Sequence, residues 1–230
     1  MKVRNRGIMD RKKDIIQIIE KMSGKYSPYF IFTDWVKCAA LTIQGACYPF
    51  HDELWHAREK EFTETIGKYS EDEIDCFSRM LSLLTETMED EMSDVLGDIY
   101  MKSGMGSKST GQFFTPFHIS ELCARASLQD LITSFDGKMV QLNEPSCGGG
   151  GMIIAAAKVL RDAGINYQRY MDVIAQDLDW NGVYMTYLQC SLYGIKATVV
   201  QGNTLADPFV PGVTGMNRIM KTPAKMGSLI

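Results

Sequence analysis

The stretch NEPSCGGGGM, residues 143–152, has four consecutive glycines after an acid, a proline, a serine and a cysteine. The apolar segment before it alternates like a short strand, and the alanine-rich segment after it is typical of a helix. A glycine-rich turn lets a ligand approach the backbone closely, because no Cβ stands in the way. It also presents the amides of a helix N-terminus to negatively charged groups. The stretch therefore predicts a ligand-binding turn between a strand and a helix.

The residues around this turn predict a regular alternation of strands and helices. Strands are expected at KMVQLNEP (138–145), MDVIAQD (171–177) and KATVVQG (196–202), with helices at 151–163 and 179–193. Short connections in this order imply a parallel, doubly wound sheet. The fold class is therefore α/β, with a Rossmann-like sheet whose ligand sits at the carboxyl ends of the strands.

The first hundred residues predict helices instead. SPYFIFTDWVKCAALTIQGA (27–46) begins with Ser27 as a candidate N-cap and Pro28 in the first turn. Apolar residues recur every three or four positions over 73–101, which predicts one long amphipathic helix. Glycines and serines then fill 102–111, a segment typical of a linker. We therefore expect a helical N-terminal region, residues 1–105, and a ligand-binding domain, residues 106–230.

Composition narrows the class of protein. No apolar run reaches the roughly 18 residues that a membrane helix needs, and the polar start is not a secretory signal, so a cytoplasmic protein is expected. Six cysteines form no CxxC pair and the three histidines complete no metal-ligand spacing, so we expect reduced thiols and no metal. The net charge is −4, unlike that of a protein that grips DNA phosphates unaided.

Polar residues at the predicted strand ends suggest a cofactor. Glu144 suits a cationic ligand group, and Asp177 is placed to accept hydrogen bonds from ribose hydroxyls. Leu178 can cover one face of an adenine ring, and the side-chain oxygen of Asn203 can accept from an exocyclic amine. Together they indicate S-adenosylmethionine. A plain ATP- or NAD-binding protein is the disfavoured alternative, since Met152 stands where a phosphate loop requires a lysine.

A further motif, GQFFTP (111–116), precedes the glycine turn by about thirty residues. With EPSCGGGGM, AQDLD and GNTL in this order, residues 77–207 resemble the gamma-class N6-adenine DNA methyltransferases, particularly the modification subunit of type I restriction-modification systems. The resemblance implies site-specific, S-adenosylmethionine-dependent methylation of adenine in DNA. It also implies a cofactor site whose methionine end contacts Phe113, Phe114, Thr115, Pro116, Glu144, Pro145, Ser146, Cys147 and Gly148, with the ribose at Asp177 and the adenine at Leu178 and Asn203. Cys147 is then a packing residue and not a nucleophile.

The sequence departs from the family in one respect: it has no Asn/Asp-Pro-Pro-aromatic segment, which in the family accepts hydrogen bonds from the target amine and stacks on the flipped base. DPFV (207–210) has one proline and follows GNTL too closely. KTPA (221–224) stands at the expected distance, but a lysine cannot accept from an amine and an alanine cannot stack. No catalytic residue is therefore assigned.

Three explanations remain for this departure. The chain is a cofactor-binding or assembly subunit without transferase activity, or a split enzyme whose catalytic strand comes from another chain, or it uses the segment in a way that the sequence does not reveal. Residue 230 precedes the later strands of the family's sheet, so a shortened domain is expected. DNA is the expected partner, reached with help from a specificity or catalytic subunit.

Overall fold

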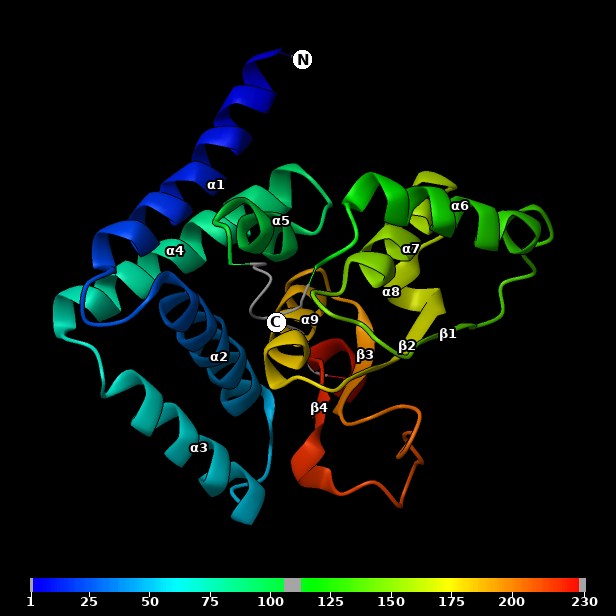
Figure 1. Cartoon of the computed structure of the whole chain (residues 1–230). Helices are drawn as coiled ribbons and strands as arrows, with labels where there is room; N and C mark the ends of the chain where they lie inside the picture. The colour runs from blue at the N-terminus through cyan, green and yellow to red at the C-terminus, as the bar shows by residue number, and fades with distance from the viewer. Residues whose placement is uncertain (1, 106–112, 228–230) are drawn as a thin grey trace.

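The computed structural model describes residues 2–105 and 113–227. The first part is helical, and a mixed sheet with its own helices follows (Figure 1). The helices of the first part are α1 (Lys2–Met22), α2 (Pro28–Cys47), α3 (Glu53–Ile66), α4 (Glu71–Asp90) and α5 (Val95–Lys102). Later elements are α6 (Phe117–Thr133), β1 (Val140–Glu144), α7 (Gly151–Asp162), α8 (Tyr167–Tyr170), β2 (Met171–Asp177), α9 (Trp180–Leu192), β3 (Lys196–Gln201), the 3₁₀ turn η1 (Met216–Arg218), β4 (Ile219–Lys221) and α10 (Pro223–Met226).

The helix starts follow the local sequence. Ser27 is the N-cap of α2, and its side chain accepts a hydrogen bond from the backbone N–H of Phe30, as the Ser-Pro pair predicts. Ser70 and Glu73 form a reciprocal capping box at the start of α4. Among the described residues, no helix is both long enough and apolar enough to span a membrane.

The prediction of one long helix over 73–101 is wrong. Helix α4 ends at Asp90, and α5 begins at Val95 after a break in which Glu91 has an extended backbone. Asp94 causes the new start, since its side chain accepts a hydrogen bond from the Gly97 N–H at 2.8 Å and caps α5. The apolar periodicity continues across the break because both helices pack their apolar faces into the same core.

The sheet has the strand order β1-β2-β3-β4, in which the first three strands are parallel and β4 is antiparallel to β3. The strand and helix positions predicted for residues 138–202 are confirmed to within a few residues. Because crossover connections are right-handed and the parallel strands follow chain order, α7 and α9 lie on the same face of the sheet. Their buried partners on β2 include Met171, Val173 and Ala175. The α/β class behind a helical N-terminal part is thereby confirmed.

The opposite face of the sheet carries polar residues that hold α10 and a loop. Lys225 of α10 forms an ion pair with Asp172 of β2 at 2.6 Å. Gln176 donates to the backbone oxygen of Asp207 and accepts from the Phe209 N–H, at 2.9 and 3.0 Å. Both faces of the parallel strands are therefore covered, one by α7 and α9 and the other by α10 and the loop.

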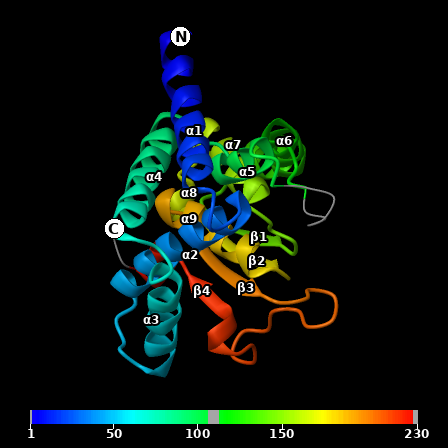
Figure 2. The same cartoon turned by 60° about the vertical axis from the view of Figure 1, so that its left-hand side comes forward.

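Helix α9 connects the two parts of the molecule. Figure 1 shows α1–α4 on one side and α6 and α7 on the other, with α9 between them, and Figure 2 shows α9 next to α2. Helix α2 packs on α9, and α6 packs on α7. Arg58 of α3 also donates to the backbone oxygen of Ile219 in β4, at 2.6 Å. The predicted domain boundary at 105/106 adjoins residues outside the described ranges and stays a prediction. Gly111 and Gln112 of the GQFFTP motif also lie outside the described residues.

Candidate cofactor site

The glycine turn between β1 and α7 is held by the end of β2 and by the middle of α9. The Gly148 N–H donates to Asp177 Oδ2 at 2.7 Å, and the Cys147 N–H donates to the Gln176 oxygen at 3.0 Å. Thr186 of α9 donates its hydroxyl to the Gly148 oxygen at 2.9 Å. The turn is thereby fixed against the carboxyl end of β2 and against α9, at the edge where a parallel sheet binds its ligand.

The glycines are required because protein groups approach the turn closely. A Cβ on Gly148 would lie 3.0 Å from the ring of Phe114, and a Cβ on Gly150 would lie 3.2 Å from the Thr186 hydroxyl. A Cβ on Gly151 would lie 2.9 Å from Asp94 Oδ2. Gly148 and Gly150 also have positive φ angles, +50° and +90°, which other residues rarely adopt. The bare backbone thus accommodates side chains from three other segments.

A cavity of about 360 Å³ opens between this turn and the segment that precedes α6. It combines residues of the glycine turn, the end of β2, the start of α5 and the start of α6. Its lining is Asp94, Phe113, Phe114, Thr115, Ser120, Ser146, Cys147, Gly148, Gly149, Gly151, Met152, Asp177 and Gly182. A volume of this order suits a nucleoside-sized ligand.

Seven of the predicted cofactor-binding residues line this cavity, although they come from three separate segments of the chain. They are Phe113, Phe114, Thr115, Ser146, Cys147, Gly148 and Asp177. Phe114 packs against Tyr100 of α5, with ring centroids 4.9 Å apart, so the segment is anchored to the helical part. Pro116 lies just outside as the N-cap residue of α6, and lines a neighbouring cavity of about 480 Å³.

The structure places the other predicted residues outside the lining. Glu144 accepts a hydrogen bond from the Ser146 N–H at 3.2 Å, and the Pro145 oxygen accepts from Thr204 at 2.6 Å. Leu178 is 66% exposed. Their predicted contacts with a cofactor stay predictions.

Asn203 has a local role in the structure that differs from the one expected. Its side-chain oxygen accepts hydrogen bonds from the N–H groups of Leu205 and Ala206, at 3.0 and 3.1 Å. This is an Asx-type turn. The oxygen that was expected to face an adenine amine is therefore already engaged with the backbone.

Asp177 is the best-placed of the predicted polar residues. One carboxylate oxygen accepts from Gly148 and the other from the Asp179 N–H at 2.9 Å. A carboxylate offers about four lone-pair positions, so both oxygens keep capacity for ribose hydroxyls. Removing this carboxylate would release the turn, and its contact with a ribose stays a prediction.

Cys147 has the environment of a packing residue. Its side chain is buried, and burial raises the pKa of its thiol to about 12. The thiolate is the reactive form of cysteine, so at neutral pH this side chain stays a neutral thiol. The geometry agrees with its expected role in packing.

Sequence reasoning missed two polar side chains of the cavity, those of Asp94 and Ser120. Asp94 is 5% exposed and Ser120 is fully buried, yet both line the cavity. Asp94 could have been found from the polar pair Ser93-Asp94 just before an apolar run, which is an N-cap signal. Ser120 carries no such signal, because it lies inside α6 and its position depends on the packing of α6 against α7.

The segment at the expected catalytic distance lies far from this cavity. Because β4 is antiparallel to β3, its end at Lys221 pairs with Thr198, near the amino end of β3. Thr222 is fully buried there, accepting from the Ala197 N–H at 3.0 Å and donating to the Ile195 oxygen at 2.7 Å. Residues 221–224 therefore stabilise the sheet at the amino end of β3, opposite to the end at which the cavity lies.

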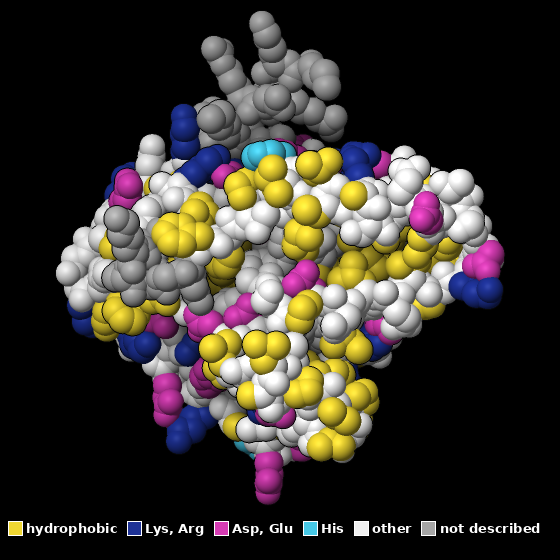
Figure 3. Space-filling view, turned by 45° about the vertical axis from the view of Figure 1, so that its right-hand side comes forward, with side chains coloured by type: hydrophobic (Ala, Val, Ile, Leu, Met, Phe, Trp, Pro, Cys, Tyr) yellow, Lys and Arg dark blue, Asp and Glu magenta, His cyan; other side chains and the backbone are white. Residues whose placement is uncertain are grey.

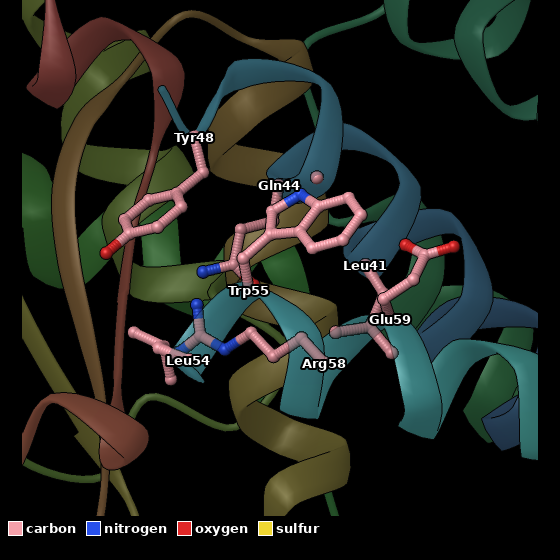
Figure 4. Close-up of a pocket in the computed structure, with 8 residues that line it drawn as sticks. Leu41, Gln44, Tyr48, Leu54, Trp55, Arg58 and Glu59 are labelled. Atoms are coloured by element: carbon pink, nitrogen blue, oxygen red, sulfur yellow. The ribbon is translucent and has the colours of Figure 1, made fainter. Parts of the chain in front are cut away.

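A small cavity between α2 and α3 is not a second candidate. It measures about 10 Å³, enough for about one water molecule. Figure 4 shows the Trp55 indole, the Gln44 amide and the Arg58 guanidinium projecting into this space. Within the described residues, Gln44 Oε1 and Trp55 Nε1 are buried without hydrogen-bond partners, which suits a single bound water.

Comparisons with known proteins find one family model and several similar solved structures. A family model described as N-6 DNA Methylase matches residues 91–224. No curated protein matches the chain. One similar solved structure is assigned to the class I S-adenosylmethionine-dependent methyltransferases, from Listeria monocytogenes, with 14% identity and a TM-score of 0.43 over 79% of this chain and 55% of that one. Another is the type I restriction-modification system methyltransferase subunit from Streptococcus thermophilus, with 17% identity and a TM-score of 0.45 over 85% of this chain and 44% of that one. The chain thus spans about half the length of these two proteins.

Proposed function

Since the chain belongs to the N-6 DNA methylase family, we propose that it binds S-adenosylmethionine between the glycine turn and the Phe113–Thr115 segment and serves in the methylation of adenine N6 in DNA. The observation that carries the proposal is the cavity of about 360 Å³, which combines two of the four family-like motifs with Asp177 of a third. An ATP- or NAD-binding function has no such support, because Met152 lines the cavity where a phosphate would need a cation.

The residues of the cavity fit the cofactor by their chemistry. The carboxylate of Asp177 suits the two ribose hydroxyls. Phe113 and Phe114 offer aromatic surface toward a sulfonium, a cation that aromatic faces attract. Ser120 Oγ, buried without a hydrogen-bond partner among the described residues, offers a polar group that a ligand would satisfy. When bound, the cofactor supplies an electrophilic methyl group.

The chain's own residues would bind and orient the cofactor. Asp177 fixes the turn through the Gly148 N–H and so couples the ribose position to the turn. Phe114, seated on Tyr100, excludes water from the methionine end. Positioning of this kind is a large part of catalysis for a transfer between two bound substrates.

A second function has a specific observation in its favour. Residues 221–224, at the expected catalytic distance, lie at the opposite edge of the sheet, and Thr222 is buried in backbone hydrogen bonds there. The alternative is a cofactor-binding or assembly subunit that transfers no methyl group by itself. In that case the acceptor groups for the adenine amine come from another polypeptide.

We also propose that a partner subunit makes most of the contacts with DNA. The net charge is −4, and on the face shown in Figure 3 lysines and arginines lie mostly toward the rim. Phosphate contacts need clustered cations. A specificity or catalytic subunit would supply them, and the complex would act in the cytoplasm.

The test is a methyl-transfer assay with unmethylated DNA and cofactor that carries a labelled methyl group, followed by mass spectrometry of the nucleosides. The chain is assayed alone and with the polypeptides that co-purify with it. N6-methyladenine formed by the chain alone supports the enzyme and eliminates the inactive subunit. Methylation only with a partner supports the split arrangement, and none in either case contradicts the proposed methylation.

A further inference from the structure

A carboxylate is buried beneath the glycine turn, and the proposed chemistry has so far given it no role. Asp94 is 5% exposed and lines both the cavity of about 360 Å³ and the neighbouring one of about 480 Å³. Its Oδ1 accepts from the Gly97 N–H and from Gln189 Nε2, each at 2.8 Å. Its Oδ2 lies 2.9 Å from where a Cβ of Gly151 would stand. The turn therefore leaves room for this carboxylate.

Among the described residues, the hydrogen-bond donors to Asp94 are neutral. Gln189 Nε2 also donates to the Gly149 oxygen at 2.7 Å, so the amide connects the carboxylate to the turn. The charge of Lys12 lowers the pKa of Asp94 only weakly, since its Nζ forms an ion pair with Asp98 at 3.1 Å. A buried carboxylate without a close cation is unfavourable. Such a group in a cavity indicates a cationic ligand.

Helix α6 offers the opposite charge preference, because Ser120 lines the same cavity and Pro116 at the start of the helix lines the neighbouring one. Pro116, its N-cap residue, makes no side-chain hydrogen bond to the first turn of this helix, which runs from Phe117 to Thr133. The N-terminus of a helix favours anions. Ser120, in the first turns of α6, is fully buried, lines the cavity and has no partner for its Oγ within the described residues. This hydroxyl is an independent sign of a missing acceptor.

A cation site and an anion site in one cavity describe the two ends of a zwitterion. We propose that Asp94 binds the α-ammonium group of the cofactor's amino-acid end and that Ser120, with the start of α6, binds its α-carboxylate. This inference rests on the proposed function, because it assumes an adenosyl cofactor in this cavity. Asp94 and Ser120 are specificity-determining residues: they select ligands that carry the complete amino acid over adenosyl compounds that lack it. No covalent step is involved.

The consequence extends to the helical part of the molecule. Asp94 is the N-cap of α5, and α5 carries Tyr100, on which Phe114 packs. A ligand held by Asp94 therefore contacts the beginning of the element that supports the opposite wall. Ligands with the ammonium group should stabilise the whole chain more than ligands without it.

The experiment is a calorimetric titration of the full chain with three adenosyl probes. S-adenosylhomocysteine has both charged groups, decarboxylated S-adenosylmethionine has the ammonium but no carboxylate, and 5′-methylthioadenosine has neither. We expect wild-type protein to bind S-adenosylhomocysteine at least tenfold more tightly than 5′-methylthioadenosine. Asp94→Asn should reduce that ratio by tenfold or more and leave the affinity for 5′-methylthioadenosine within about twofold. Asp94→Asn should also weaken the binding of decarboxylated S-adenosylmethionine. Ser120→Ala should weaken S-adenosylhomocysteine but leave the decarboxylated probe unchanged.

The variants are chosen so that a loss of binding can be told apart from a loss of folding. Asparagine is as good an N-cap as aspartate, and Asp98→Asn, one turn along α5 and paired with Lys12 and Lys102, is the matched control that should leave all ratios unchanged. If Asp94→Asn does not fold, the wild-type ratio and Ser120→Ala decide the matter. Binding of all probes with equal affinity, or ratios unmoved by both variants, overturns this inference and leaves the proposed function standing. Absence of binding by every probe to folded wild-type protein overturns both.

Discussion

Gly151→Ala tests the position of Asp94 directly. Gly151 begins α7 and its φ is not positive, so an alanine there meets no backbone strain. A Cβ would stand 2.9 Å from Asp94 Oδ2 and 3.6 Å from Asp94 Cβ. Its closest contact is therefore with the carboxylate of Asp94.

The expected change in the free energy of unfolding for Gly151→Ala follows from two opposing effects. Overpacking a well-packed site costs about 1–3 kcal/mol, whereas replacing a helical glycine by alanine gains up to about 1 kcal/mol. We expect Gly151→Ala to destabilise the wild type by about 1–2 kcal/mol. In an Asp94→Ser background the carboxylate is gone, while serine still caps α5, and the same substitution should be neutral or slightly stabilising.

The assay is a double-mutant cycle by urea denaturation, with the midpoint compared at constant m value. The coupling energy between positions 94 and 151 should be about 1–2.5 kcal/mol. Gly24→Ala, where nothing lies within 4 Å of the added Cβ, should change stability by less than about 0.5 kcal/mol. An additive cycle, or a stabilising Gly151→Ala in the wild type, would refute the placement of Asp94 beneath the turn.

Three other results are expected. Gly148→Ala combines a φ of +50° with a Cβ 3.0 Å from an aromatic ring, so it should lower the melting temperature more than Gly164→Ala, which has a φ of +79° and open space; equal shifts would show that the ring does not press on the turn. Burial raises the pKa of Asp94, so the folded state loses stability as pH rises from the ordinary carboxyl range through that pKa. Asp94→Asn should therefore raise the melting temperature of the ligand-free protein more at pH 8 than at pH 5, and a constant difference by scanning calorimetry would contradict this. Burial also raises the pKa of Cys147 to about 12, so iodoacetamide at pH 8 should label exposed Cys123 much faster than Cys147 by mass spectrometry, and comparable rates would show that Cys147 is accessible.

The sequence predicts the elements of the sheet well because their signals are local. Short apolar segments mark β1–β3, and the glycine turn marks the start of α7. The same reasoning failed over 73–101, where helical periodicity continued through a real break. Periodicity records which residues face the core, and it cannot record that α4 ends at Asp90 and that Asp94 starts α5.

The candidate site was only partly predictable for a related reason. Residues within the motifs were found, but Asp94 lies about fifty positions before the glycine turn and reaches it only through tertiary packing. Ser120 gains its meaning from being buried without a partner within the described residues, which no sequence pattern reveals. For Asn203 the structure adds a backbone role that sequence reasoning did not foresee, because its side-chain oxygen accepts from the Leu205 N–H, and its contact with an adenine stays a prediction.

The most direct test of the central claim is a calorimetric titration of the folded chain with S-adenosylmethionine, comparing wild type with Asp177→Ala. The account predicts binding at one site, weakened at least tenfold by the substitution, which is about 1.4 kcal/mol. Part of this loss would come from the released Gly148 N–H, so the melting temperature of the variant is measured alongside. Folded wild-type protein that does not bind the cofactor, or a folded variant that binds it equally well, would contradict the account.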